Sequence, residues 1–293
     1  MRPLRLLGLI AGLALCHDGL TAGARAEGRP DPERVVERAA ASIARLHQNA
    51  SRALVNAAQD EAYAEYFHAL AREDSHDHDH DHDHGPGEGA HHHETTTALK
   101  ERIDRISLSV QERFAVEEMC LIDLDGREVS RIVGDEIAHD LATDEASASF
   151  FAPGFATPYR KVYVAPLYLS TDADKWVVAY VTPILVEGEA RSILHYERGL
   201  SAYTAILDRV SAATGAKLLV VTASNHLVYD SRAPVFTGAI DDAVMLDDSF
   251  ARLDAAAPDA VGWLAPFLGR PAGSVAAATR IVEDWMIVAW VPK

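Results

Sequence analysis

A run in which histidine alternates with aspartate is the part of this sequence best suited to chemistry. Imidazole is the commonest protein ligand for zinc, nickel and copper, and carboxylates can complete the coordination shell. In an extended chain every second residue points the same way, so the histidines of the run share a side. We therefore predict that the segment binds zinc, nickel or copper; a charged, solvated loop with incidental metal affinity is the alternative. The predicted ligands are His76, His78, His80, His82, His84, His91, His92 and His93.

No motif typical of an enzyme accompanies these histidines. The sequence contains no Gly-x-Ser-x-Gly, His-Glu-x-x-His, Gly-x-x-x-x-Gly-Lys or Cys-x-x-Cys. His139, His195 and His226 stand singly in different predicted elements, where a histidine is more often a surface or core residue than a catalytic group. We therefore predict that the protein is not an enzyme and requires no cofactor.

The composition indicates a globular protein with an acidic surface. Hydrophobic residues make up 48% of the 293 residues, which is enough for a sizeable core. The formal net charge is −17. Nucleic acids and anionic membranes carry charge of the same sign, so neither is an expected partner.

The first 26 residues resemble a cleavable export signal. Arg2 and Arg5 precede an apolar run, and Ala24 and Ala26 place small side chains where a signal peptidase reads them. The apolar run has ten residues, whereas a membrane-spanning helix needs about 20. We therefore expect a periplasmic protein that does not span the membrane. A lipoprotein acylated at Cys16 is the alternative, against which the large residue before that cysteine counts.

Two helices are expected to hold the histidine run. An Asp-Pro pair at residues 31–32 is a typical helix start, and glycine and further proline are then absent up to the histidines. We predict one helix over residues 27–72, roughly 60 Å long at about 1.5 Å per residue. A flexible loop over residues 73–94 follows. A second helix, capped by residues 95–97 and ending near Phe114, then packs antiparallel to the first. The apolar stripe of the first helix comprises Val36, Ile43, Leu46, Ala50, Leu54 and Ala57.

From residue 116 onward the period of hydrophobicity changes to two, which predicts strands. The first group of predicted strands comprises residues 116–123, 128–133, 161–169, 175–186 and 190–197, followed by a helix over 200–213. The second group comprises residues 217–221, 226–229, 274–282 and 285–291, with a helix near 245–256. This order predicts an α+β fold with two antiparallel-sheet modules, residues 95–209 and a smaller one at 210–293.

Several strings in this order resemble the double Cache domain, the extracellular PAS-like sensor unit of bacterial kinases, chemoreceptors and cyclases. Residues 121–131 (LIDLDGREVSR) resemble its first hairpin, and residues 162–170 (VYVAPLYLS) its central strand. Further similar strings lie at residues 150–151, 179–184, 200–203, 220–230 and 285–288. The resemblance covers about residues 31–293 and implies a long helix followed by two PAS-like modules, the larger of the membrane-distal type.

The resemblance implies that a small ligand lies against the sheet of the larger module. Part of the family binds amino acids through an Arg, a Trp and tyrosines on a ligand-facing helix, but residues 151–155 here read Phe-Ala-Pro-Gly-Phe. The ligand class is therefore not carried over. The residues expected at the ligand site are Arg131, Phe151, Tyr163, Tyr168, Trp176 and Tyr180.

Alternation along the predicted strands sorts these candidates. Trp176 and Tyr180 share one strand face, whereas Tyr163 and Tyr168 are expected on opposite faces of the neighbouring strand. Aromatic rings with polar tips around the Arg131 cation suit a small organic ligand that carries an acidic group. Ordinary packing of the rings and a salt bridge at Arg131 are the alternative.

Two functions fit the sequence. The first is a periplasmic sensor protein that binds a small ligand and signals through a separate membrane partner, such as a sensor kinase, a cyclase or a transporter. A separate partner is expected because members of the family usually lie between transmembrane helices and pass their signal to an output region, which does not follow here. The second is a periplasmic metal-binding protein that buffers or delivers zinc, nickel or copper. The two merge if the sensed ligand is the metal.

Overall fold

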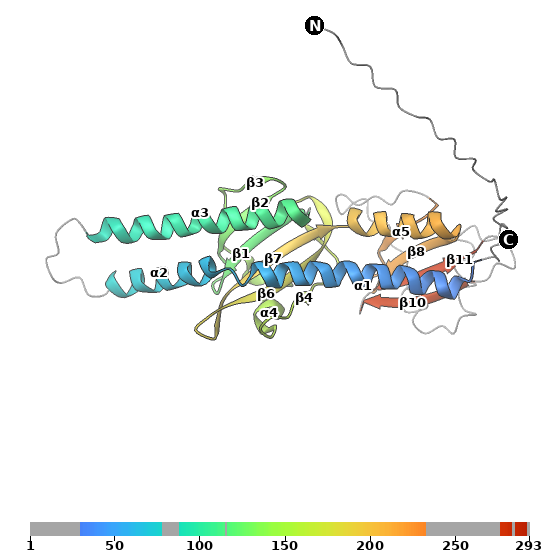
Figure 1. Cartoon of the computed structure of the whole chain (residues 1–293), viewed down its shortest axis with the longest axis horizontal. Coiled ribbons are helices and arrows are strands. Elements are labelled where there is room, and N and C mark those ends of the chain that lie inside the picture. The colour runs from blue at the N-terminus through green and yellow to red at the C-terminus, as the bar shows by residue number, and fades with distance from the viewer. Residues whose placement is uncertain (1–29, 78–87, 115, 233–275, 283–284, 292–293) are drawn as a thin grey trace, which may run out of the picture.

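A single helix runs alongside both sheets of the molecule and fixes its elongated shape (Figure 1). The computed structural model describes residues 30–77, 88–114, 116–232, 276–282 and 285–291, with the backbone alone for residues 73–77, 88–95 and 276–282. Helix α1 (Pro32–Ala57) starts as predicted, with the Asp31 side chain accepting a hydrogen bond from the Glu33 amide. It contacts β10 and β11 of the small sheet and β6 of the large one. Within the described residues, no helix has the length and apolar composition to cross a bilayer.

The prediction of a single helix over residues 27–72 is wrong in one respect, because the helix is interrupted at residues 58–60. Helix α2 (Glu61–Asp77) begins after the break. The Asp60 side chain accepts a hydrogen bond from the Ala62 amide at 3.0 Å, so it caps a new helix within the predicted stripe. Arg102 of the facing helix forms ion pairs with Asp60 and with Glu61, at 3.3 Å each. The Asp60 cap and its ion pair with Arg102 thus explain the interruption between α1 and α2.

The predicted loop over residues 73–94 is shorter than expected among the described residues. Helix α2 continues to Asp77, and α3 (Glu88–Phe114) begins before the threonines that were expected to cap it. The two helices contact each other as an antiparallel pair, as predicted (Figure 1). Residues 78–87, which include four of the predicted metal ligands, lie outside the described residues.

The large sheet is antiparallel throughout and has the strand order β3-β2-β1-β7-β6-β4, with β5 also paired to β6. Its elements are β1 (Glu118–Asp123), β2 (Glu128–Val133), β3 (Glu136–Ile137), β4 (Tyr163–Val164), β5 (Tyr168–Ser170), β6 (Lys175–Val186) and β7 (Glu189–Gly199). The single strand predicted over residues 161–169 is in fact two strands, because Pro166 has no amide hydrogen to donate to a ladder. A one-turn helix η1 (Glu145–Ser147) and a short helix α4 (Phe151–Ala156) precede β4.

The two faces of the large sheet pack against different partners. On one face, side chains such as Leu121 and Tyr196 join the apolar side of α1, α2 and α3. On the other face, Ile122 and Val181 pack with residues around α4. The close approach of α4 depends on Gly154, where an added Cβ would lie 2.5 Å from a methyl group of Val181.

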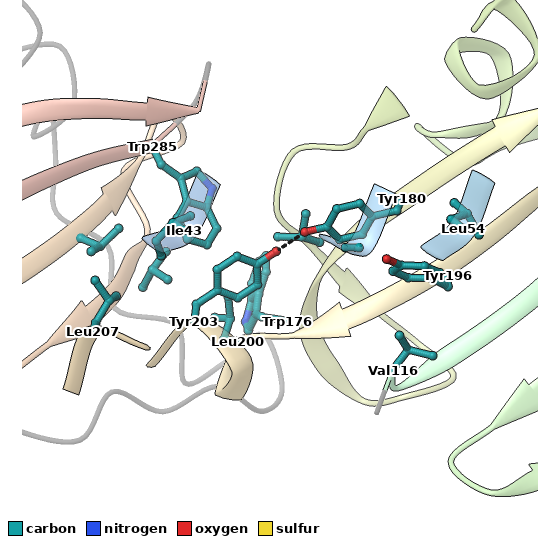
Figure 2. Close-up of a cluster of buried hydrophobic side chains, with 14 of the residues drawn as sticks. Ile43, Leu54, Val116, Trp176, Tyr180, Tyr196, Leu200, Tyr203, Leu207 and Trp285 are labelled. Atoms are coloured by element: carbon teal, nitrogen blue, oxygen red, sulfur yellow. Dashed lines mark hydrogen bonds between the residues drawn. The ribbon is translucent and has the colours of Figure 1, made fainter. Parts of the chain in front are cut away.

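The small sheet follows α5 (Ser201–Thr214) and has the strand order β10-β11-β8-β9. Its strands are β8 (Lys217–Thr222), β9 (Leu227–Asp230), β10 (Ala276–Val282) and β11 (Trp285–Trp290). These confirm the predicted second group of strands, while the helix predicted near residues 245–256 lies outside the described residues. Figure 2 shows how Tyr203 and Trp285 continue the buried cluster from the large module into the small one. The predicted α+β architecture of two antiparallel sheets is confirmed.

Candidate functional site

The residues predicted to bind a ligand are divided between the two faces of the large sheet. Tyr163 lies opposite Val181 and Tyr168 opposite Val177, so both tyrosines share the face that α4 covers. The prediction that they lie on opposite faces is wrong, since the break between β4 and β5 removes the simple alternation. Arg131 lies opposite Cys120 on this same face, and Phe151 packs there from α4.

Trp176 and Tyr180 share a face as predicted. It is the face that packs against α1, α2 and α3, which we call the helix-covered face, and not the face on which α4 lies. The Tyr180 hydroxyl lies 2.6 Å from His47 Nδ1. It also lies 2.9 Å from the Tyr203 hydroxyl, a contact that Figure 2 shows as a dashed line. The Trp176 ring stands 4.3 Å from the ring of His226 in the small module, measured between centroids. These two side chains therefore connect α1 and the two modules, and they do not meet the other four predicted ligand-site residues.

A cavity of about 200 Å³ lies on the α4 side of the large sheet. Strand β1 contributes Glu118 and Cys120 at alternate positions, and the neighbouring strand β7 contributes His195 and Glu197 in the same way. Of the predicted ligand-site residues, Tyr168 lines this cavity. Five carboxyl groups line it, and none of the lining residues is Lys or Arg. The carboxyl groups belong to Glu118, Glu128, Glu145, Asp172 and Glu197.

A small network of hydrogen bonds joins the cavity residues. Tyr168 donates its hydroxyl hydrogen to Glu197 Oε1, and its oxygen lies 3.1 Å from His195 Nε2. The Cys120 thiol donates to Glu118 Oε1 at 3.1 Å. Phe150, at the start of α4, stacks on the His195 ring with 4.0 Å between the centroids. The side chains are thus held in fixed positions around the cavity.

Two polar atoms of the cavity wall are buried and have no hydrogen-bond partner among the described residues. They are Nδ1 of His195 and Oε2 of Glu197, on residues that are 2% and 3% exposed. A buried polar atom without a partner costs free energy of about 1–3 kcal/mol, and more for a charged group. Such atoms in a cavity wall are the positions where a ligand would make its contacts.

Burial shifts the pKa values of the cavity groups in the direction that favours their uncharged forms. It raises the pKa of Glu118 to about 9, with the nearby Glu197 as the second cause. Burial likewise raises the pKa of Glu197. It also raises the pKa of the Cys120 thiol, with Glu118 and Glu128 adding to the effect. The pKa of His195 falls to about 3 for the same reason, so its imidazole is neutral at neutral pH.

Arg131 is already surrounded by carboxylates. Its guanidinium lies 3.5 Å from Glu128, 2.8 Å from Asp140 and 3.4 Å from Asp172, while its side chain is 7% exposed. The sequence predicts that Arg131 meets an acidic group of the ligand. In the structure, the protein itself supplies those acidic groups, so the alternative of a salt bridge is the one observed.

Most of the residues that line the cavity were not predicted from the sequence. Glu118 and Cys120 stand two residues apart in one predicted strand, and His195 and Glu197 in another, so each pair was predictable as sharing a face. The adjacency of those two strands was not predictable, because 65 residues and five strands lie between them in the chain. An ionisable residue at alternate positions of an otherwise apolar strand was the signal available.

Comparison with solved structures identifies the fold. The ligand-binding domain of the Campylobacter jejuni chemoreceptor Tlp3, in complex with 4-methylisoleucine, matches with a TM-score of 0.58 and 12% identity over 88% of each chain. The sensor domain of the V. cholerae histidine kinase DctB matches with a TM-score of 0.55 and 12% identity, over 89% of this chain and 95% of that one. In sequence, the chain matches no protein-family model and no curated protein. The chain therefore has the fold of these sensor domains, as its resemblance to the double Cache family predicts.

Proposed function

We propose that the protein is a binding component of a sensory system, in which a small ligand occupies the cavity between the large sheet and α4. The observation that carries the proposal is the cavity with unpartnered, buried polar atoms of His195 and Glu197 in its wall. The sensor fold supports it, since chains of this fold include ligand-binding domains of chemoreceptors. We expect binding without catalysis.

The chemistry of the cavity favours a ligand with positive charge. Five carboxyl groups line the cavity, no Lys or Arg lines it, and the adjacent Arg131 is held by three carboxylates. A cation would favour the charged form of Glu118, whose pKa burial raises to about 9. An acidic ligand would add a like charge to the same space and is disfavoured. This proposal replaces the expectation of an acidic ligand.

Thermal unfolding with a panel of small molecules tests the proposed site. We expect amines, cationic amino acids or divalent metals to raise the Tm of the chain lacking residues 1–26. At a ligand concentration one hundred times Kd, the free energy of unfolding should increase by about 3 kcal/mol. Ala148→Phe places a ring in the cavity wall and should remove the response. Ala212→Phe, on an exposed position of α5, is the matched control and should keep it. Stabilisation by acids alone, or an equal response in Ala148→Phe, would refute the proposed site.

We further propose export to the periplasm and signalling through a membrane-bound kinase, cyclase or transporter. Residues 1–26, which carry the predicted export signal, lie outside the described residues. Photo-crosslinking in cells, with a reactive residue at an exposed position of α5, should capture one inner-membrane protein. Capture of soluble proteins alone, or retention of the full-length chain in the cytoplasm, would contradict this part of the proposal.

Metal binding by the histidine-rich segment is a second candidate function. The antiparallel pairing of α2 and α3 favours it, because the backbone of His76 near the end of α2 and that of residues 91–93 near the start of α3 lie at the same end of the pair. Calorimetric titration with zinc and nickel should show binding that deletion of residues 75–94 abolishes. Binding that survives the deletion unchanged would assign the metal to another part of the chain.

A further inference from the structure

Three side chains in the cavity bring metal-ligating atoms close together. Glu118, Cys120 and Glu128 each offer one such atom, and these atoms lie within 4.8 Å of one another. All three residues are buried, with exposures of 3%, 2% and 7%. A register shift between Leu121 and Ile122 places Glu128 opposite Ile122, on the same face as Cys120. The bulge therefore completes a set that regular pairing of β1 and β2 would not assemble.

We propose that the cavity holds a divalent metal ion of the zinc class, bound by Glu118, Cys120 and Glu128. Zinc takes a thiolate at about 2.3 Å and carboxylate oxygens at about 2.0–2.2 Å, usually with tetrahedral geometry. Those lengths place a sulfur and an oxygen ligand about 3.6 Å apart, and Cys120 Sγ lies 3.1 Å from Glu118 Oε1. Three protein ligands leave a fourth position for water or for a group of another ligand in the cavity.

An independent observation also points to a bound cation. Glu197 and His195 line the same cavity, and each has a buried atom with no partner among the described residues. These atoms are suited to bond the fourth ligand of the metal, or a water molecule that it holds. Metal-ligating groups are commonly oriented by such outer partners. The unpartnered atoms and the three ligands thus belong to one site.

The donor set separates a metal from an organic cation. Carboxyl groups would serve an ammonium ion equally well, but a buried thiol offers an ammonium ion very little, while a thiolate is a strong ligand for zinc-class ions. Binding would release the Cys120 proton, and any proton held by a carboxyl ligand, to solvent as the metal–sulfur and metal–oxygen bonds form. Hard ions such as magnesium and calcium prefer oxygen ligands only, and they are therefore excluded from the proposal.

The inference deepens the proposed function and rests on it, because the ion would be the ligand of the same cavity or part of its binding site. The test uses the chain lacking residues 1–26, which precede the described structure, so that Cys120 is the only cysteine left. Titration with Co²⁺ should produce the near-ultraviolet absorption of a thiolate–cobalt bond, with a final intensity that corresponds to one thiolate-bound ion per chain. Zinc added to the metal-free protein should release protons to a pH indicator, and zinc added after cobalt should abolish the absorption.

Variants assign this signal to the cavity. Cys120→Ser should remove the absorption, and Glu128→Gln should weaken the apparent affinity at least about tenfold. A triple variant, His91→Ala with His92→Ala and His93→Ala, is the control; it should keep the absorption because histidine sites contain no sulfur. Circular dichroism verifies that each variant is folded, and Glu128→Gln tests the site even if Cys120→Ser does not fold.

The outcomes separate this inference from the proposed function. No thiolate absorption at saturating Co²⁺, or an unchanged affinity in Glu128→Gln, would overturn the metal site. If an amine then stabilises the chain and Ala148→Phe abolishes that effect, the proposed function stands and its ligand is organic. If neither metals nor amines act through the cavity, both proposals fail.

Discussion

The two faces of the large sheet are built from adjacent residues of the same strands, yet they differ in chemistry. On β7, Tyr196 packs against the helices on one face, whereas Glu197 lines the cavity on the other. Both residues are almost fully buried, at 0% and 3% exposed, so burial does not distinguish the faces. The number of carboxyl groups does: the helix-covered face buries mainly apolar side chains and rings beside Asp104 and Arg198, whereas the cavity face buries three carboxyl groups, those of Glu118, Glu128 and Glu197. Buried carboxyl groups cost stability, so their concentration on one face indicates a binding role.

The largest expected effect comes from the helix-covered face. Tyr180→Ala removes a ring that contacts Tyr196 and His47, and it should lower the free energy of unfolding by about 3–5 kcal/mol. Tyr180→Phe keeps the ring and loses only the hydroxyl contacts, so it should cost about 1 kcal/mol. Urea denaturation measures both. Equal losses for the two variants would mean that the hydroxyl contacts, and not the packed ring, hold this face.

Arg131 provides the next test, because it stands at the edge of the acidic face. Arg131→Met leaves Glu128 and Asp172 without their cation and should cost about 3 kcal/mol. Arg127→Met removes an exposed ion pair with Asp125 and is the control, with an expected change below about 0.5 kcal/mol. A cost at Arg131 no larger than that of the control would show that its three carboxylates do not depend on it.

A third test concerns the pH dependence of the helix-covered face. Burial, together with the nearby Arg198 guanidinium, lowers the pKa of His47 to about 4 in the folded state, against about 6.5 when unfolded. Between these values the unfolded chain binds a proton that the folded chain does not. Stability from this group is therefore complete above pH 6.5 and falls as the pH drops towards 4, by about 2 kcal/mol after allowance for partial exposure.

His47→Gln isolates this contribution. The groups that face His47 are the Tyr180 hydroxyl, the Tyr203 ring and the Arg198 cation. The difference in unfolding free energy between wild type and His47→Gln should change between pH 7 and pH 4.5 by that amount. A difference that stays constant with pH would show that His47 titrates normally in the folded protein.

The smallest change in stability is expected at Glu197, where the substitution should stabilise the protein and not destabilise it. Glu197→Gln removes a buried carboxyl group while keeping an oxygen for the Tyr168 hydroxyl, so the ligand-free protein should gain about 1 kcal/mol. Its stabilisation by cationic ligands should decrease at the same time. Glu187→Gln, at an exposed turn, is the matched control and should change neither property. Lower stability in Glu197→Gln would mean that the carboxyl group is structural.

The sequence predicts the fold far better than the site. Periodicity located β6 to the residue, because a strand buried on both faces is a long apolar run with clear ends. It missed the kink at Asp60, since a capping side chain acts through one local hydrogen bond that does not disturb the apolar stripe. The cavity depends on which strands are neighbours and on the bulge between β1 and β2. Neither can be predicted from the periodicity of hydrophobic residues. Arg131 was predicted at the ligand site, but two of its three carboxylate partners, Asp140 and Asp172, come from other segments of the chain.

The most direct test of the account is a crystal structure of the protein purified from the periplasm without chelator, with anomalous data collected at a transition-metal absorption edge. We expect a cation in the cavity, within bonding distance of carboxylate oxygens of Glu118 and Glu128, with an anomalous peak if that cation is the proposed metal. A positively charged organic molecule at the same oxygens would support the proposal of a cationic ligand and would contradict the proposal of a metal ion. An anion bound beside Arg131, with the five carboxyl groups turned away from it, would contradict the account.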